Sequence, residues 1–470
     1  HPYVQRSTMR TSARALVAVS ALALVLAACS SGTDSDGGET TSGSSEGSGE
    51  ATTIKVAYQK TDSFFQLHDL LAEKKTAFEA ANPGVTIELV PIAAQETDYF
   101  TKLALMNGSA DTAPDVIYED TFQVRPDAAA EFLLPLDDYL AEWEDWEQFP
   151  EGIREAGKGD DGSIYGVSMG TDTRGIYFNK EIFAQAGLPE DWQPESWDDL
   201  LEAARAVKEA VPDVIPLNIY SSKAQGEAAS MQGFQMLLYG TDDTLYDAEE
   251  GKWIVGSKGF EDTLTFLKTM HDEGLAPSLE DSLDTNLPNR VSGELLPEGK
   301  LAIAVDGSWV PGGWMAGDNA WAEWEDVMGM AAMPTQNGQE PGSTSMSGGW
   351  LLSVGAKSKA PQTAFDFIAF TLDEEGSFKF ATENSQIAAR EDVAANPEYV
   401  SFNPSFEFFS SLVPNTNFRP ATPDYAQISN NIQVAAESVI TGQATPEQAA
   451  ATYDEAVTRV VGDDKVKAAN

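Results

Sequence analysis

The chain has 470 residues, with 75 Asp and Glu against 29 Lys and Arg, which gives a formal net charge of −46 at pH 7. This charge disfavours nucleic-acid binding and close adsorption to anionic lipid, because both depend on Lys and Arg side chains that neutralise phosphates. One cysteine excludes a disulfide within the chain and, with three histidines in all, disfavours a zinc site, so we expect no metal or other cofactor.

The first fifty residues have the composition of export and anchoring segments. Three arginines precede the apolar run 15–28, which is too short to cross a bilayer, and Leu26–Cys29 (LAAC) follows the pattern of a bacterial lipobox. We therefore predict a lipoprotein signal peptide over 1–28 and lipidation of Cys29. Residues 29–50 are then the lipidated cysteine and a flexible Ser/Gly-rich tether. An ordinary secretory signal with a chance cysteine is the alternative.

Strands and helices alternate after this segment. Apolar patterns predict strands over 54–58, 85–89 and 114–118 and helices over 63–81 and 99–106. A strand, a helix and a strand in about 35 residues form a βαβ unit, so we predict that the sheet is parallel at its start.

The alternation continues to the end of the chain. Further strands are predicted over 176–178, 300–305 and 350–354, and helices after Ser196, over 260–271, over 361–372 and after Thr445. Ser196 with Asp199, and Thr445 with Gln448, have the spacing of capping boxes. Helices that alternate with strands throughout predict the α/β class.

Sequence blocks with a family resemblance occur along nearly the whole chain after the tether. They are APDV (113–116) with FLLPLDDYL (132–140); DGSIYGV (161–167) with YFNKEIF (177–183), AGLP (186–189) and SWDDL (196–200); GKLA (299–302) with DGSW (306–309); GGW (348–350) with FDFI (365–368) and ARED (389–392); and RP (419–420) with GQATPE (442–447). In this order and spacing they resemble the family 1 extracellular solute-binding proteins of bacterial ABC importers, the group that contains maltodextrin-binding protein.

The resemblance implies a two-lobed fold of the type II periplasmic-binding-protein kind, with the ligand in a cleft between lobes joined by crossing hinge strands. It places 51–171 and 340–390 in the amino-terminal lobe, and 172–339 and 391–470 in the carboxy-terminal lobe. It also implies a protein without enzymatic activity that closes around an oligosaccharide and delivers it to the permease subunits of an ABC transporter. We expect a monomer on the outer face of a Gram-positive cell membrane, held there by the lipid on Cys29 alone.

Aromatic residues are the first candidates for the ligand site, because rings stack on the apolar faces of sugars. Trp309 and Trp350 follow glycine-rich turns, where a bulky ring is less expected in a core, and the resemblance places both at the cleft. Trp314 is a third candidate. Phe65 is preferred to Phe64, which fits the buried stripe of its helix. The alternative is that the tryptophans are core rings beneath loops.

Polar candidates follow predicted strands or glycine turns, or come from the resembling blocks: Asp172, Arg174, Glu119, Asp120, Tyr220, Asp306, Arg390 and Arg419. Ligands bind beyond the ends of strands in open α/β sheets, and carboxylates and guanidinium groups bond to sugar hydroxyls. An ion pair between lobes is the alternative for Asp172 with Arg174, and a solvated loop end is the alternative for Glu119 with Asp120. Both Arg390 and Arg419 could instead clamp carboxylates of the lobes.

Two other functions stay open at this point. A secreted carbohydrate-active enzyme would need two carboxylates about 5–9 Å apart, and 75 acidic residues make such pairs available, although the chain has no H-E-x-x-H or P-loop motif. A binding protein for a peptide, a polyamine or a metal is the second alternative.

Overall fold

The computed structural model describes residues 51–470, apart from the side chains of Glu96 and Thr97. The predicted signal peptide, Cys29 and the tether lie outside the described residues. None of the helices in the described part of the chain combines the length and the hydropathy that a membrane span needs.

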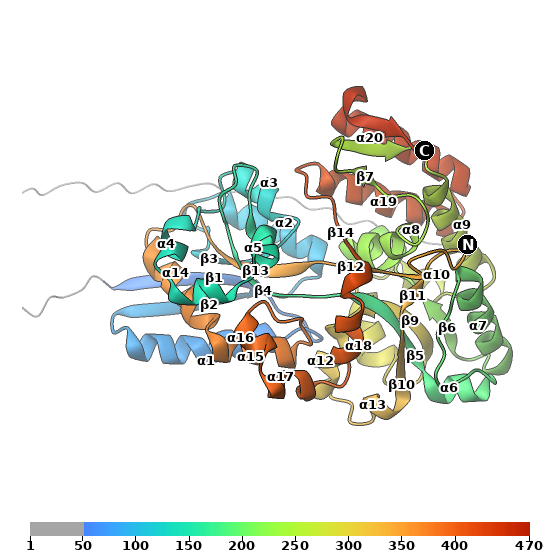
Figure 1. The fold of residues 1–470 in the computed structure, drawn as a ribbon, viewed down its shortest axis with the longest axis horizontal. Coiled ribbons are helices and arrows are strands. Elements are labelled where there is room, and N and C mark those ends of the chain that lie inside the picture. The colour runs from blue at the N-terminus through green and yellow to red at the C-terminus, as the bar shows by residue number, and fades with distance from the viewer. Residues whose placement is uncertain (1–50) are drawn as a thin grey trace, which may run out of the picture. The chain divides into compact units, whose positions relative to one another are not determined.

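A five-stranded sheet organises the first lobe (Figure 1). Its strands lie in the order β2 (Val85–Ile92), β1 (Thr52–Gln59), β3 (Val116–Asp120), β13 (Gly349–Val354) and β4 (Val167–Thr171). Strand β1 is parallel to both β2 and β3, which confirms the predicted parallel start, whereas β13 is antiparallel to β3 and β4. The longer helices of this lobe are α1 (Gln66–Ala81), α2 (Glu96–Asn107), α14 (Pro361–Thr371) and α15 (Glu374–Glu383).

A four-stranded sheet organises the second lobe. Its strands lie in the order β10 (Met328–Ala331), β5 (Arg174–Asn179), β9 (Leu301–Gly307) and β6 (Ile215–Asn218). The longer helices here are α7 (Trp197–Ala210), α9 (Lys258–Asp272), α19 (Tyr425–Ile440) and α20 (Pro446–Val461), of which α9, α19 and α20 pack on one another.

Small sheets and short helices complete the described chain. Two three-stranded sheets have the orders β11 (Met333–Pro334), β12 (Ser343–Ser347), β14 (Thr416–Phe418) and β15 (Val466–Ala468), β8 (Lys252–Val255), β7 (Tyr246–Asp247). The short helices are α3 (Val124–Ala129), α4 (Asp137–Ala141), α5 (Glu151–Arg154), α6 (Lys180–Gln185), α8 (Met236–Leu238), α10 (Leu279–Ser282), α11 (Leu287–Arg290), α12 (Val310–Met315), α13 (Trp324–Val327), α16 (Glu391–Ala394), α17 (Pro397–Phe402) and α18 (Phe406–Ser411).

Each lobe has its own apolar core. In the first lobe, buried residues of β1, β3 and β13 pack with α1 and α14, as Val56 and Leu70 illustrate. In the second lobe, residues such as Phe178, Leu264 and Ile432 form a separate cluster between the sheet and α7, α9 and α19. Because apolar burial is the main favourable term in folding, each core stabilises its own lobe. The second cluster also includes Phe122 of the first lobe, whose ring centroid lies 5.5 Å from that of Tyr425 on α19, so the lobes share some apolar contact.

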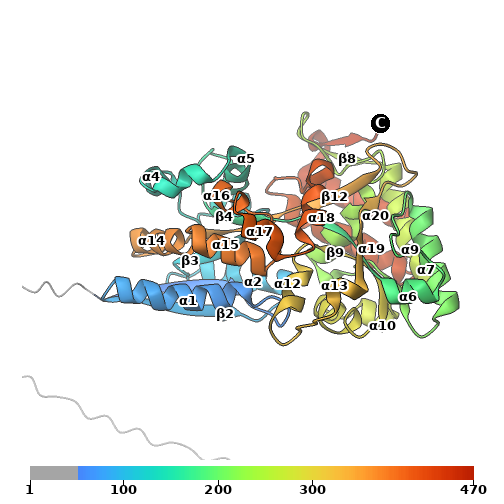
Figure 2. The ribbon, with the colours of Figure 1, turned by 60° about the horizontal axis from the view of Figure 1, so that its bottom comes forward.

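The chain passes between the lobes at several points. It crosses at 172–173, between β4 and β5, and at Gly348, between β12 and β13. Helices α16 and α17 pack on α15 of the first lobe (Figure 2), whereas Phe409 of α18 packs in a core cluster of the second. Residues 391–402 thus lie against the first lobe, although the resemblance assigned them to the second, and the lobe bounds stay a prediction.

The two predicted capping boxes differ in the structure. At α20, Thr445 Oγ1 accepts from Gln448 N (3.2 Å) and Gln448 Oε1 accepts from Thr445 N (3.0 Å), so this box is confirmed. At α7, Ser196 Oγ accepts from Asp199 N (3.2 Å), but the Asp199 carboxylate accepts from Glu195 N (2.8 Å). The second half of that box was therefore predicted wrongly, because a carboxylate can reach either amide of the turn.

We expect Thr445→Ala to lower the free energy of unfolding by about 1 kcal/mol, because it leaves an amide of the first turn without its acceptor. Thr445→Ser, which keeps the hydroxyl, should stay within about 0.5 kcal/mol of the parent protein. Equilibrium urea unfolding followed by circular dichroism measures both. An alanine variant as stable as the serine variant would contradict the assigned role of the cap.

Candidate functional site

A cleft of about 1260 Å³, counting space open to solvent, is lined by residues of both lobes. The first lobe contributes side chains at the carboxyl ends of β1 and β3 and at the start of β13. The second lobe contributes the start of β5, the end of β9 and the segment after β6. This is the position that open α/β sheets offer to ligands, because loops diverge where strands end.

Stacked rings form the wall of the first lobe. Trp350, which is half-buried, stacks on Tyr118 with ring centroids 4.2 Å apart and 8° between the planes. Phe100 stacks on Trp350 at 5.8 Å, and Phe64 stacks on Tyr118 at 5.8 Å. Three of these rings, Phe64, Tyr118 and Trp350, line the cleft, so an extended apolar surface faces it.

The backbone conformation of the glycine before Trp350 determines where this ring lies in the cleft wall. Gly349 has φ +148°, a conformation that side-chain-bearing residues rarely adopt. A Cβ atom at Gly349 would also lie 2.7 Å from the Gly170 carbonyl oxygen of β4. Gly349 is therefore needed for the close approach of β13 to β4, and Trp350 is the next residue.

Trp309 forms part of the opposite wall. It follows β9 at Asp306-Gly307-Ser308, and a Cβ atom at Gly307 would lie 2.0 Å from its ring, so only glycine lets the indole fold back here. The Arg174 guanidinium lies 4.7 Å from the Trp309 ring centroid. This cation–π contact restrains the plane of the ring, which is half-buried and lines the cleft.

Asp172 and Arg174 join the two central crossings. Their side chains form a buried ion pair, and Asp172 Oδ1 also accepts from Gly348 N (2.9 Å) of the second crossing. Arg174 donates further to Gln232 Oε1 (3.2 Å) and to the Met346 carbonyl oxygen (3.2 Å). The structure thus combines the two readings of this pair, since both residues line the cleft and both link segments that cross between lobes.

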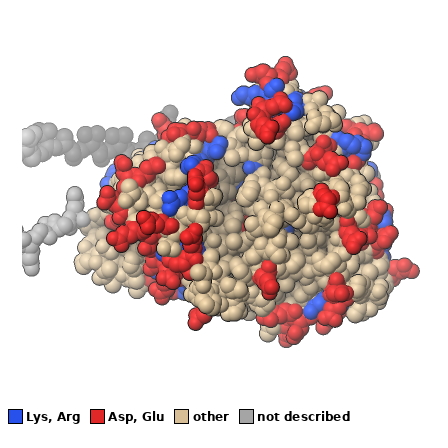
Figure 3. Space-filling view, viewed as in Figure 1, with Lys and Arg blue, Asp and Glu red and all other residues tan. Residues whose placement is uncertain are grey.

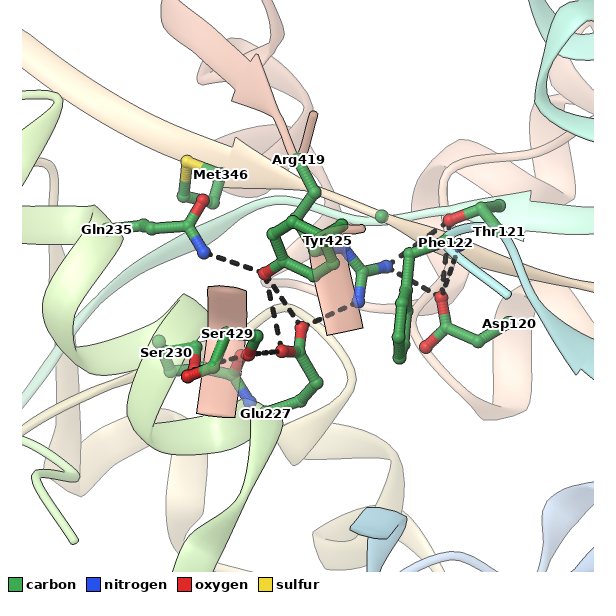
Figure 4. A network of polar contacts seen from close by, with 12 residues as sticks. Asp120, Thr121, Phe122, Glu227, Ser230, Gln235, Met346, Arg419, Tyr425 and Ser429 are labelled. Carbon is green, nitrogen blue, oxygen red and sulfur yellow. Dashed lines mark hydrogen bonds and ion pairs between the residues drawn. The ribbon is translucent and has the colours of Figure 1, made fainter. Parts of the chain in front are cut away.

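Arg419, directly after β14, bridges the lobes through carboxylates (Figure 4). Its guanidinium donates to Asp120 Oδ1 (2.6 Å) of the first lobe and to Glu227 Oε2 (3.0 Å) of the second. Glu227 also accepts from the hydroxyls of Tyr425 and Ser429 on α19. Burial by itself would lower the pKa of Arg419, but the two carboxylates raise it above its usual range. The guanidinium is therefore charged at every accessible pH.

Asp306 is the residue before the last in β9 and is 5 % exposed. Its carboxylate accepts from the Tyr220 hydroxyl (2.8 Å) and from Gly307 N (2.8 Å). Burial raises the pKa of Asp306 to about 6 in spite of these two hydrogen bonds. Trp314 lines the same cleft but is 1 % exposed, and its Nε1 donates to the Ser292 carbonyl oxygen (2.6 Å), so it is chiefly a core ring.

The cleft brings together eight of the eleven predicted ligand-site residues: Trp309, Trp350, Trp314, Asp172, Arg174, Asp120, Tyr220 and Asp306. The remaining three, Glu119, Phe65 and Arg390, do not line it. Arg419, the residue named together with Arg390, does line it. Cys29 lies outside the described residues.

Glu119 was placed wrongly because neighbouring residues of a strand point to opposite faces. Its carboxyl is buried behind the sheet, and burial and then the nearby Asp127 carboxyl raise its pKa well above the usual range. Tyr118 and Asp120, which flank it, both line the cleft. Strict alternation along 116–120 would have identified Tyr118.

Phe65 and Arg390 have structural contacts instead. Phe64, not Phe65, lines the cleft, while the Phe65 ring packs on Gly317 of the second lobe. Arg390 donates to Asp145 (2.9 Å) and to Asp392 (2.7 Å), so it clamps carboxylates of the first lobe. A residue just before a helix can turn to either side, so spacing alone could not choose between the two phenylalanines.

Sequence reasoning also missed amides and methionines of the cleft, which come from segments far apart in the chain: Gln59, Gln95, Met169, Gln225, Met231, Gln232, Asn289, Asn319, Asn384 and Gln386. Nothing in the sequence distinguishes these residues from the other amides and methionines of the chain. Within residues 51–470 no group of three or more His, Cys, Asp or Glu side chains is arranged to hold a metal ion.

Comparisons with known proteins place this geometry in context. The family model described as bacterial extracellular solute-binding protein matches residues 65–377. A binding protein of Brucella abortus (strain 2308) is 23% identical over 86% of this chain and 91% of its own length. An ABC transporter solute-binding protein of Thermotoga lettingae TMO, solved with alpha-D-tagatose, has a TM-score of 0.76 at 21% identity, covering 87% of this chain and all of that one.

The GacH receptor of Streptomyces glaucescens, solved without ligand and with acarbose, has a TM-score of 0.74 at 22% identity, covering 89% of this chain and 100% of that one. These structures share the two-lobed fold of type II periplasmic sugar-binding proteins, which confirms the predicted fold class. The family model covers well over half of the residues. The chain therefore belongs to the bacterial extracellular solute-binding protein family.

Proposed function

We propose that this protein is the ligand-binding subunit of an ABC importer and that its ligand is an oligosaccharide. The observation that carries the proposal is the pair of half-buried indoles, Trp350 from the first lobe and Trp309 from the second, in one cleft with buried carboxylates and amides. Sugars present apolar C–H faces and a rim of hydroxyls, which these two kinds of group match. The relatives solved with tagatose and with acarbose support the choice of a sugar.

The placement of the rings favours more than one sugar unit. Trp350 and Trp309 stand in different walls of the cleft. Rings at separate places on the two walls would each hold one sugar face. Xylo-, gluco- and malto-oligosaccharides all fit this description.

Closure of the lobes over the ligand is the proposed capture step. In the structure the lobes already touch at the edge of the cleft, where Ser63 Oγ and Asn289 Oδ1 are 2.6 Å apart and Phe65 packs on Gly317. Arg419 also links the two lobes, through Asp120 and Glu227. A ligand that bonds to both lobes binds the closed form better and shifts the population toward it. The closed form then docks on the permease subunits.

Delivery leaves the ligand unaltered in this proposal. Gly166–Gly170 (GVSMG) has the G-x-S-x-G spacing of a serine nucleophile, but Ser168 lies within β4 rather than at a turn between strand and helix. Its hydroxyl is buried and is used in contacts with Gly170 N (3.2 Å) and Gly170 O (3.4 Å). The family to which the chain belongs binds solutes. A single copy of the chain supplies all the residues that line the cleft, which is consistent with the proposed monomer.

We expect a matching oligosaccharide to raise the melting temperature, because ligand at 100 times its dissociation constant adds about 2.7 kcal/mol of stability. Trp309→Ala and Trp350→Ala should each remove most of this shift, since the stacking surface is lost. Differential scanning fluorimetry against xylotriose, cellotriose, maltotriose, peptides and polyamines measures it. Release of sugar from a chromogenic glycoside without any shift would instead favour the enzyme.

Trp146→Ala is the matched control. Trp146 packs on Trp143 and Arg154 outside the cleft, so its loss should lower the unliganded melting temperature and leave the sugar-induced shift intact. If the cleft variants instead lowered the unliganded melting temperature by more than the Trp146 variant and kept the shift, Trp309 and Trp350 would be core rings.

We expect Cys29→Ser to release the protein from the membrane, because the lipid on Cys29 is the proposed anchor and the net charge of −46 disfavours adsorption to anionic lipid. Expression in a Gram-positive host followed by immunoblots of membrane and medium fractions tests this. The serine variant should be found in the medium with its sugar-induced thermal shift unchanged. Membrane retention of the variant would show that another segment anchors the chain.

A further inference from the structure

Acidic side chains outnumber basic side chains in the cleft. Among the described lining residues the ionisable acids and bases are Asp120, Asp172 and Asp306 against Arg174 and Arg419, and Glu227 stands directly behind Arg419. With all of them ionised, four carboxylates therefore meet two guanidinium groups.

Both guanidinium charges are already compensated within the protein. Arg174 is paired with Asp172, and Arg419 is shared by Asp120 and Glu227 (Figure 4). Their remaining N–H groups can still donate to a ligand oxygen. An acid group on a ligand would therefore find no uncompensated positive charge at either arginine.

Of the three aspartates that line the described cleft, Asp306 is the one that forms no ion pair with a Lys or Arg side chain. Its hydrogen bonds come from two neutral donors, the Tyr220 hydroxyl and Gly307 N. The charged or titratable groups packed around it are Arg174 and Tyr177 on β5 and Tyr220 after β6. Arg174 is held by Asp172, and the Tyr177 hydroxyl donates to the Gly307 carbonyl oxygen (2.7 Å). Asp306 lines the cleft, and a carboxylate can accept more hydrogen bonds than these two.

We propose that Asp306 selects ligands by charge: it accepts carbohydrates that present a hydroxyl or an ammonium donor to it and excludes carbohydrates that carry an acid group there. The inference rests on the proposed function, because it concerns which carbohydrates enter the same cleft. The outer surface acts in the same direction, since Figure 3 shows carboxylate-bearing residues spread over the visible face among fewer basic ones, and the net charge is −46. Long-range repulsion slows the approach of anions.

The test uses trimers matched in configuration and different in charge. The probes are cellotriose, fully deacetylated chitotriose and C6-oxidised cellotriose, with maltotriose and C6-oxidised maltotriose as the second series, titrated calorimetrically into the full chain at pH 7.5. We expect the acid trimers to bind on the order of 100-fold more weakly than their neutral parents, because like charges in a desolvated site repel strongly. The amino trimer, which offers an ammonium, should bind at least as tightly as cellotriose.

Asp306→Asn tests the assignment to this residue. The variant should narrow the difference between neutral and acid trimers to less than about tenfold and should remove any preference for the amino trimer. Asp366→Asn is the control, because Asp366 is exposed on α14 and its substitution changes the net charge by the same amount. This variant should keep the difference in affinity between neutral and acid trimers that the parent protein shows. An unchanged difference in Asp306→Asn would overturn the proposal.

A pH series tests it without any substitution, in case Asp306→Asn does not fold. Asp306, with its pKa near 6, is largely neutral at pH 5, whereas the uronic acids stay ionised, so the discrimination should shrink between pH 7.5 and pH 5. Acid trimers that bind within threefold of their parents at pH 7.5 would contradict the selection while leaving sugar binding intact. A protein that binds no carbohydrate of any charge would instead remove the proposed function itself, and this inference with it.

Discussion

The carboxylate of Asp172 joins the two central crossings of the chain, and the geometry of the cleft depends on that junction. It holds the Arg174 guanidinium of one crossing and Gly348 N of the other. A buried ion pair contributes little net stability on average, because desolvation of two charges offsets their attraction. Its value here is geometric, since it fixes Trp309 through Arg174 and the turn before Trp350 through Gly348.

Separate cores explain how such a cleft can exist. Each lobe buries its own apolar surface, so the facing surfaces need not be apolar and can hold polar groups and half-buried rings. Carboxylates of both lobes lie there because β3 ends in Asp120 and β9 has Asp306 next to its last residue, both at the cleft. The positive charge of Arg419 lies between the carboxylates of Asp120 and Glu227 and offsets the repulsion between them. Asp306, by contrast, accepts hydrogen bonds from two neutral donors, the Tyr220 hydroxyl and Gly307 N.

Sequence patterns predicted the candidate site in part, and the misses have local causes. Glycine-rich turns marked Trp309 and Trp350, and strand ends marked Asp120 and Asp306. The alternation of side chains in β3 put Glu119 behind the sheet and Tyr118 in front of it. Arg390 had the chemistry of a ligand residue, but its place beside Asp145 and Asp392 depends on segments that are distant in sequence.

The sequence by itself determined the order of strands and helices, the parallel start of the first sheet and the α/β class, because apolar periodicity and turn residues are local properties. Its ordered blocks also carried the family resemblance. Only the tertiary structure decided which amides enter the cleft, which carboxylates are paired and which way Phe64 and Phe65 turn. These features depend on contacts between residues up to about three hundred positions apart, as in Asp120 with Arg419, and local patterns do not encode such distances.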